Sequence, residues 1–166
     1  MIVDLITKLT VKLTNPKVSV DDKLIEICHK TQQLIDGADR VSLWVFSEGF
    51  NKIKSLLCYD ATTGQYTSGQ ELSRDDYTEY FDAIIKKEII NAPLARDNVF
   101  TQCFTESYFE PLKIYSLLDF ILHKDFEPTG IICCEGVGEV KHWSDENIKT
   151  LKRIASISSF CFHLEG

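Results

Sequence analysis

The sequence predicts an α+β domain in which helices cover both faces of an antiparallel sheet. Apolar residues recur at helical spacing in four segments, two of them before residue 38, one near residues 73–85 and one after residue 144. Shorter apolar runs between these segments are joined by turns into hairpins, so neighbouring strands are antiparallel. These runs have apolar residues on both faces, and each face of the sheet therefore needs a covering layer. The runs are residues 41–46, 53–59, 116–123 and 129–135.

The length and composition fit one globular domain. A chain of 166 residues buries roughly 70% of its unfolded surface in a single core. The net charge is -7 and Lys and Arg are scattered along the chain, so we expect no nucleic-acid partner. The apolar runs are far shorter than the roughly 20 residues of a membrane helix, and we expect no membrane span.

The N-terminus and the cysteines bear on the cellular compartment. The first residues are apolar, but Asp4, Lys8 and Lys12 interrupt any signal-peptide core. A domain of this size folds without disulfides, and the neighbours Cys133 and Cys134 lie in an apolar run. We therefore expect a cytoplasmic protein with reduced, buried cysteines.

Two helices precede the first strand. In residues 2–13, apolar side chains recur at steps of three and four. Ser19, followed three residues later by Asp22, is typical of a helix start, and Gly37 is typical of a helix stop.

In the middle of the chain, the spacing of apolar residues changes from that of a helix to that of strands. A polar turn joins residues 41–46 to residues 53–59 as a hairpin, and residues 60–72 contain a loop and a third, weaker strand. Ser73 and Asp76 are then expected to cap a helix.

The last third begins irregularly. Residues 88–115 contain a proline break and two short helical pieces, near residues 97–104 and 106–109. A second hairpin follows, and Ser144 is expected to cap the final helix.

Common catalytic and metal-binding motifs are missing from the sequence. There is no CxxC, HxxxH or HExxH spacing and no glycine-rich phosphate loop. Cys133 and Cys134 fit a core better than a nucleophilic site, which needs an exposed thiol and a nearby cation. Because adjacent strand residues face opposite ways, at most one of the two thiols faces a pocket.

Asp119 is the most informative polar residue, because its strand is otherwise apolar. An unpartnered carboxylate there would cost several kcal/mol. Its partner is either a group of the domain, such as Arg40 or a backbone amide, or a bound ligand. The helix after residue 73 carries an aromatic stripe that we expect in the core: Tyr77, Tyr80 and Phe81.

Several segments together resemble the GAF family of small-molecule sensor domains. The resemblance covers residues 20–163 and rests on the order and spacing of the segments. They are residues 38–46 (ADRVSLWVF), 73–81 (SRDDYTEYF), 91–97 (NAPLARD), 116–119 (SLLD), 130–136 (GIICCEG) and 142–146 (HWSDE).

The resemblance implies a six-stranded antiparallel sheet with the first and last helices on one face. Residues 60–115 would roof a ligand pocket on the other face. It also implies a regulatory module that is not itself an enzyme and is followed by an output domain, such as a histidine kinase or a diguanylate cyclase. Residues 1–18 would then be an N-terminal helical extension, residues 19–164 the GAF domain, and residues 165–166 an addition to the natural chain.

The sequence departs from the family at three places. Val140 and Lys141 stand where cyclic-nucleotide-binding members carry an Asn-Lys pair, which disfavours a cyclic nucleotide. The segment after residue 118 reads DFIL and lacks the family's proline. The cysteines match neither the bilin-binding nor the sulfoxide-reducing pattern, and no cofactor is assigned.

The main hypothesis is a bacterial sensor module. Its unidentified small ligand would bind under the roof and shift a homodimer interface made by the N- and C-terminal helices. Two alternatives stay open: a cysteine-dependent sulfoxide reductase, and a structural dimerisation domain with a collapsed pocket. The side chains expected to face the pocket are Trp44, Asp97, Tyr108, Ser116, Asp119 and Cys134.

Overall fold

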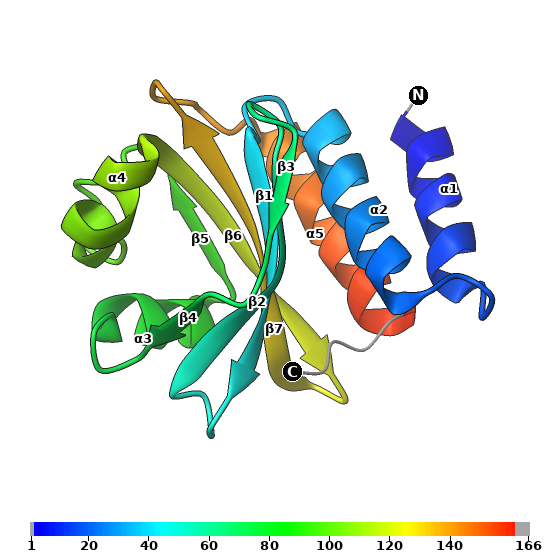
Figure 1. Cartoon of the computed structure of the whole chain (residues 1–166), viewed down its shortest axis with the longest axis horizontal. Helices are drawn as coiled ribbons and strands as arrows, with labels where there is room; N and C mark the ends of the chain where they lie inside the picture. Colours follow the sequence, from blue (N-terminus) through cyan, green and yellow to red (C-terminus); the bar gives the residue numbers. More distant parts are fainter. Residues whose placement is uncertain (1, 162–166) are drawn as a thin grey trace.

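The computed structural model describes residues 2–161, which form three layers with a twisted sheet in the middle (Figure 1). All strand pairs are antiparallel, in the order β3-β2-β1-β7-β6-β5, and β4 also pairs with β2. The strands are β1 (Arg40–Ser47), β2 (Lys52–Asp60), β3 (Gln65–Thr67), β4 (Glu71–Ser73), β5 (Ile89–Ala92), β6 (Ile114–Lys124) and β7 (Glu127–Val137).

Three helices cover one face of the sheet: α1 (Ile2–Thr14), α2 (Val20–Leu34) and α5 (Asp145–Cys161). The helix α1 is the outermost and packs on α2 and α5 (Figure 1). The Ser19 hydroxyl accepts a hydrogen bond from the Asp22 N–H at 3.1 Å, so the predicted cap of α2 is confirmed. We call these three helices the helical layer.

Shorter segments cover the opposite face. They are α3 (Thr78–Lys87), the 3-10 turn η1 (Gln102–Phe104), the π-helical turn η2 (Thr105–Phe109) and α4 (Glu110–Leu112). We call α3 together with residues 93–112 the roof, and Figure 1 shows α3 and α4 on the side of the sheet away from α1, α2 and α5.

The alternation of side chains in the central strands creates two separate cores. On β1, Leu43 belongs to the core under the helical layer, whereas Trp44 belongs to the core under the roof. Across β7, Cys134 lies in the first core and Cys133 in the second. The sheet therefore needs cover on both faces, as its apolar sequence predicted.

The predicted α+β class, antiparallel sheet and flanking helices are confirmed, with differences in detail. The sheet has seven strands instead of six, because β3 and β4 pair with different halves of β2. Ser73 does not cap α3: it lies in β4, its hydroxyl accepts from the Asp75 N–H, and the helix begins at Thr78.

The boundary expected at residue 164 and the addition expected at residues 165–166 lie outside the described residues. Within residues 2–161, no helix combines the length and the apolar character needed to cross a membrane.

Candidate functional site

A small cavity lies between the sheet and the roof. Its volume is about 20 Å³, which is room for roughly one water molecule. The walls are mainly aromatic and aliphatic, with two acidic side chains among them. The lining residues are Trp44, Ile53, Leu72, Tyr80, Phe104, Tyr108, Phe109, Leu117, Asp119, Cys133 and Glu135.

Asp119 is the most unusual group in this cavity. Its side chain is on β6, is only 2% exposed, and lies opposite Cys133 of β7. The Tyr80 hydroxyl, from α3, donates a hydrogen bond to its Oδ2 atom. The Oδ1 atom is buried and has no hydrogen-bond partner within the described part of the chain. A buried polar atom without a partner costs about 1–3 kcal/mol, so this oxygen lacks a donor that a water or a ligand could supply.

Burial controls the protonation of Asp119. Removal from water raises the pKa of this carboxyl to about 7, and the negative charge of Glu135 acts in the same direction. The Cys133 thiol and the Tyr80 hydroxyl oppose the shift but do not cancel it. Near neutral pH, Asp119 therefore changes its charge in response to small changes in its surroundings.

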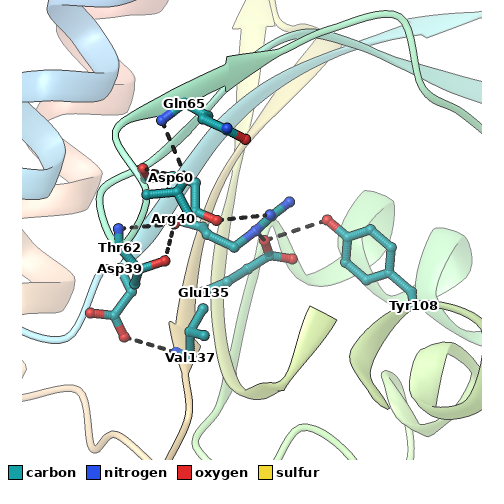
Figure 2. A network of polar contacts seen from close by, with 9 residues as sticks. Asp39, Arg40, Asp60, Thr62, Gln65, Tyr108, Glu135 and Val137 are labelled. Carbon is teal, nitrogen blue, oxygen red and sulfur yellow. Dashed lines mark hydrogen bonds and ion pairs between the residues drawn. The ribbon is translucent and has the colours of Figure 1, made fainter. Parts of the chain in front are cut away.

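The second acid, Glu135, belongs to a network of polar contacts that Figure 2 shows. Its Oε1 atom accepts from the Arg40 Nε at 3.0 Å and from the Tyr108 hydroxyl at 3.4 Å. Arg40 also reaches Asp60 on β2 at 3.5 Å. Burial raises the pKa of Glu135, and the Arg40 guanidinium opposes that rise. The network joins the roof, through Tyr108, to three strands of the sheet.

A larger groove opens beside the cavity, and Trp44 and Tyr108 line both. Its volume is about 380 Å³. The hydroxyl of Ser55, on the groove wall, is buried and has no partner within residues 2–161. We call this hollow the roof-edge groove; its lining residues are Arg40, Trp44, Ser55, Cys58, Thr67, Ser68, Gln70, Ser107, Tyr108, Pro111 and Leu112.

Three of the six side chains expected to face the pocket line the cavity: Trp44, Tyr108 and Asp119. Cys134 does not, because β7 turns it into the core under the helical layer, and Cys133 faces the cavity instead. Asp97 is exposed at the surface of the roof and lines neither hollow.

Ser116 is also placed away from the cavity. It is fully buried, and its hydroxyl donates to the Pro93 carbonyl at 2.7 Å and accepts from the Lys141 N–H at 2.7 Å. Its observed role is therefore to tie two loops to the start of β6.

Eight of the eleven lining residues were not predicted as site residues, and three of these eight carry an ionisable group: Tyr80, Cys133 and Glu135. Tyr80 lies in the core under the roof, as expected, and its hydroxyl is also the partner of Asp119, for which the sequence suggested Arg40 or a backbone amide. Glu135 carries the same sequence signal as Asp119, an acid within an apolar strand. That signal points to both carboxyls of the site.

Five cysteines have thiols that are harder to ionise than an exposed thiol. Burial raises the pKa of the thiols of Cys28, Cys58, Cys103, Cys133 and Cys134, which is the opposite of what a nucleophilic cysteine needs. Cys58 in the roof-edge groove reaches a pKa of about 11, although Arg40 partly offsets its burial. Within residues 2–161, no three His, Cys, Asp or Glu side chains gather as metal ligands would.

Comparison with known proteins gives structural matches only. No protein-family model matches the sequence, and no curated protein sequence matches it significantly. The GAF domain of a two-component sensor histidine kinase from Bacillus halodurans superposes with a TM-score of 0.65 at 17% identity, covering 87% of this chain and 93% of that one. The phycocyanobilin-bound GAF domain of a cyanobacterial phytochrome superposes with a TM-score of 0.74 at 14% identity, covering 96% of this chain and 92% of that one.

A third match is longer than this chain. The chromophore-binding domain of Stigmatella aurantiaca bacteriophytochrome gives a TM-score of 0.72 at 10% identity over 96% of this chain, which spans 59% of that domain's length. The three structures share the layered antiparallel architecture found here over nearly the whole described chain. The chain therefore has the fold of a GAF domain.

Proposed function

We propose that this chain is a ligand-sensing regulatory domain, the N-terminal sensory module of a bacterial signalling protein such as a histidine kinase or a diguanylate cyclase. In this role it binds a small molecule and catalyses no reaction itself. The histidine kinase origin of one structural match and the bound phycocyanobilin of another support a sensory role for this fold. The proposal does not extend to a bilin as the ligand.

One observation carries the proposal. The site under the roof contains two buried side-chain oxygens that lack partners among the described residues, Asp119 Oδ1 and Ser55 Oγ. Asp119 lines the cavity and Ser55 lines the roof-edge groove, and Trp44 and Tyr108 line both hollows. Buried polar atoms are almost always hydrogen-bonded. Two of the three exceptions among the described residues lie at this site, the third being Ser158 Oγ on α5, and this pairing favours a ligand that completes the site.

The coupling mechanism follows from the two-sided sheet. Trp44 lines both hollows, and its neighbours Leu43 and Val45 on β1 pack under the helical layer. A ligand that moved Tyr108 and Trp44 would displace β1 and thereby the packing of α2 and α5. In the proposed sensor this displacement changes a homodimer interface of the terminal helices. Such a shift requires the ligand to bind one arrangement more tightly than the other.

A structural dimerisation domain is the second candidate, because the cavity holds only about 20 Å³. A pocket of that size admits roughly a water molecule. In that case the aromatic side chains simply form a second core, and dimerisation proceeds without a ligand.

A thermal-shift screen of a metabolite library distinguishes the two. A sensor yields compounds that raise the melting temperature of the wild-type chain, since a ligand present at 100 times its Kd stabilises the folded state by about 2.7 kcal/mol. The variant Ser68→Trp, on the exposed rim of the groove, should lose most of this effect by blocking entry.

The control is Asp75→Trp, an exposed residue in the turn before α3 that lines neither hollow. It should retain the response. A library that stabilises no variant, together with a dimer in sedimentation experiments, supports the structural candidate and contradicts the sensor.

A further inference from the structure

We propose that the site under the roof takes an organic cation: a compact protonated amine that contacts Asp119 with its ammonium head and lays an apolar body in the roof-edge groove. This inference rests on the proposed sensory function and adds the chemical class of the ligand.

The charges of the residues that line the cavity favour a cationic ligand. Among the described residues that line the cavity, two are carboxylic acids, Asp119 and Glu135, and none is Lys, Arg or His. The cation that contacts Glu135, Arg40, is already shared between Glu135 at 3.0 Å and Asp60 at 3.5 Å. Its single positive charge therefore leaves Asp119 without compensation. An incoming cation would supply it and would donate the hydrogen bond that Oδ1 lacks.

The aromatic walls point to the same class of ligand. Phe104 packs against Tyr80, Tyr108 and Phe109 with ring centroids 5.0–5.9 Å apart, and Trp44 completes the lining. Aromatic faces attract cations within about 6 Å, and this attraction is strongest where water is excluded. A carboxylate surrounded by such rings favours an ammonium over an anion or a neutral group.

The sizes of the two hollows set the shape of the ligand. A cavity of about 20 Å³ accepts a head no larger than roughly a water molecule, which fits an ammonium group but not a ring. The groove of about 380 Å³ is large enough for an apolar body and is walled by Tyr108, Pro111 and Leu112. Because Trp44 and Tyr108 line both hollows, a ligand that bridges the hollows contacts both of these side chains.

The protonation of Asp119 makes the proposal sensitive to pH. The groups around it are Tyr80 on α3 and Cys133 and Glu135 on β7, and Glu135 in turn contacts Arg40 on β1 and Tyr108 on η2. With a pKa of about 7, Asp119 is mostly neutral at pH 6 and mostly ionised at pH 8. An ammonium ligand should therefore bind about tenfold more weakly at pH 6 than at pH 8. A ligand that accepts a hydrogen bond from protonated Asp119 would show the reverse.

The test uses three probes of similar shape and different charge: benzylamine, benzyl alcohol and benzoate. Each is titrated into the wild-type chain while the Trp44 indole signal is followed by NMR. We expect benzylamine to bind at least tenfold more tightly than the other two, and more tightly at pH 8 than at pH 6. The Asp119→Asn variant should weaken benzylamine at least tenfold and remove the pH dependence. The exposed Asp97→Asn serves as its control and should bind like wild type.

The probe series on the wild-type chain tests the inference even where the Asp119→Asn variant fails to fold. Equal or tighter binding of benzyl alcohol or benzoate overturns the cation inference while leaving a ligand pocket in place. Binding of none of the three also overturns it, and the library screen then decides separately whether the domain senses another molecule.

Discussion

The two faces of the sheet are packed from the same strands but differ in chemistry. Under the helical layer the core consists mainly of aliphatic side chains, and it also contains Cys28, Cys134 and Trp143. Under the roof it is rich in aromatic rings and encloses Asp119 and Glu135, both at most 2% exposed. Alternation along β6 and β7 directs both acids to the roof side.

This difference separates stability from recognition. Apolar packing under the helical layer contributes stability without specific partners, although the Ser158 hydroxyl of α5 is also buried without a partner among the described residues. The roof side differs because it buries two carboxyl groups, and the Oδ1 atom of Asp119 lacks a hydrogen bond there, a cost that natural proteins retain mainly at functional sites. Substitutions on the two faces should therefore have different consequences.

The largest expected effect is the loss of the buried ion pair. Arg40→Met leaves Glu135 without its cation, and breaking a buried pair in this way lowers the free energy of unfolding by about 4 kcal/mol. Urea denaturation measures this loss. The control is Arg74→Met, whose partner Asp82 is largely exposed, and it should lose less than about 1 kcal/mol. Equal losses would mean that the network is no more important than a surface ion pair.

A matched pair of leucines compares the faces directly. Leu43→Ala under the helical layer and Leu117→Ala under the roof each remove a buried side chain, and each should lower the free energy of unfolding by about 3 kcal/mol. Only Leu117 lines the cavity, so only Leu117→Ala should change benzylamine affinity. A change of the same size in Leu43→Ala would contradict a separation of the two faces.

The smallest effect concerns the contact between roof and network. Tyr108→Phe removes a hydroxyl that donates to Glu135 at the long distance of 3.4 Å, and about 1 kcal/mol of stability should be lost. Tyr77→Phe removes an exposed hydroxyl 2.9 Å from Ser107 and should lose less. Thermal melts of the two variants check the order; a reversal would show that the roof is not held by Tyr108.

Hydrophobic periodicity predicted the α+β class and most of the long elements. It succeeded there because α2 and the strands of the two hairpins each bury a clear apolar face. It missed β4 and β5, whose three or four residues are too short for a period to show. It also misplaced the start of α3, since Ser73 forms local hydrogen bonds that suit a turn as well as a helix cap.

The sequence predicted only part of the site. An acid in an apolar strand marked Asp119, and Trp44 and Tyr108 followed from the layering. Glu135 carries the same signal but was not predicted. Choosing between Cys133 and Cys134 required the strand register, because a shift of one residue exchanges the two faces. Asp97 lies in the irregular chain before β6, and Ser116, although it lies in β6, is held by the loop residues Pro93 and Lys141. No periodic pattern describes such segments.

The uncompensated charge of Asp119 also affects stability, with a definite sign. Its pKa is about 7 in the folded chain against 3.8 as the ordinary value, so folding favours the protonated form. This contribution to stability is complete below about pH 4 and is lost as the pH rises through 7. Asp119→Asn should lack this loss, which urea denaturation at pH 4 and pH 8 can measure against wild type.

The most direct test of an uncompensated carboxylate under the roof is its own titration. Carbon-detected NMR of the wild-type chain labelled at the aspartate carboxyls, with Asp119 assigned by the signal missing in Asp119→Asn, gives the pKa of that group. We predict a midpoint near 7 in the free protein and a fall when benzylamine is added. A midpoint near 4, unchanged by the probe, would show that Asp119 is already compensated and would contradict the account.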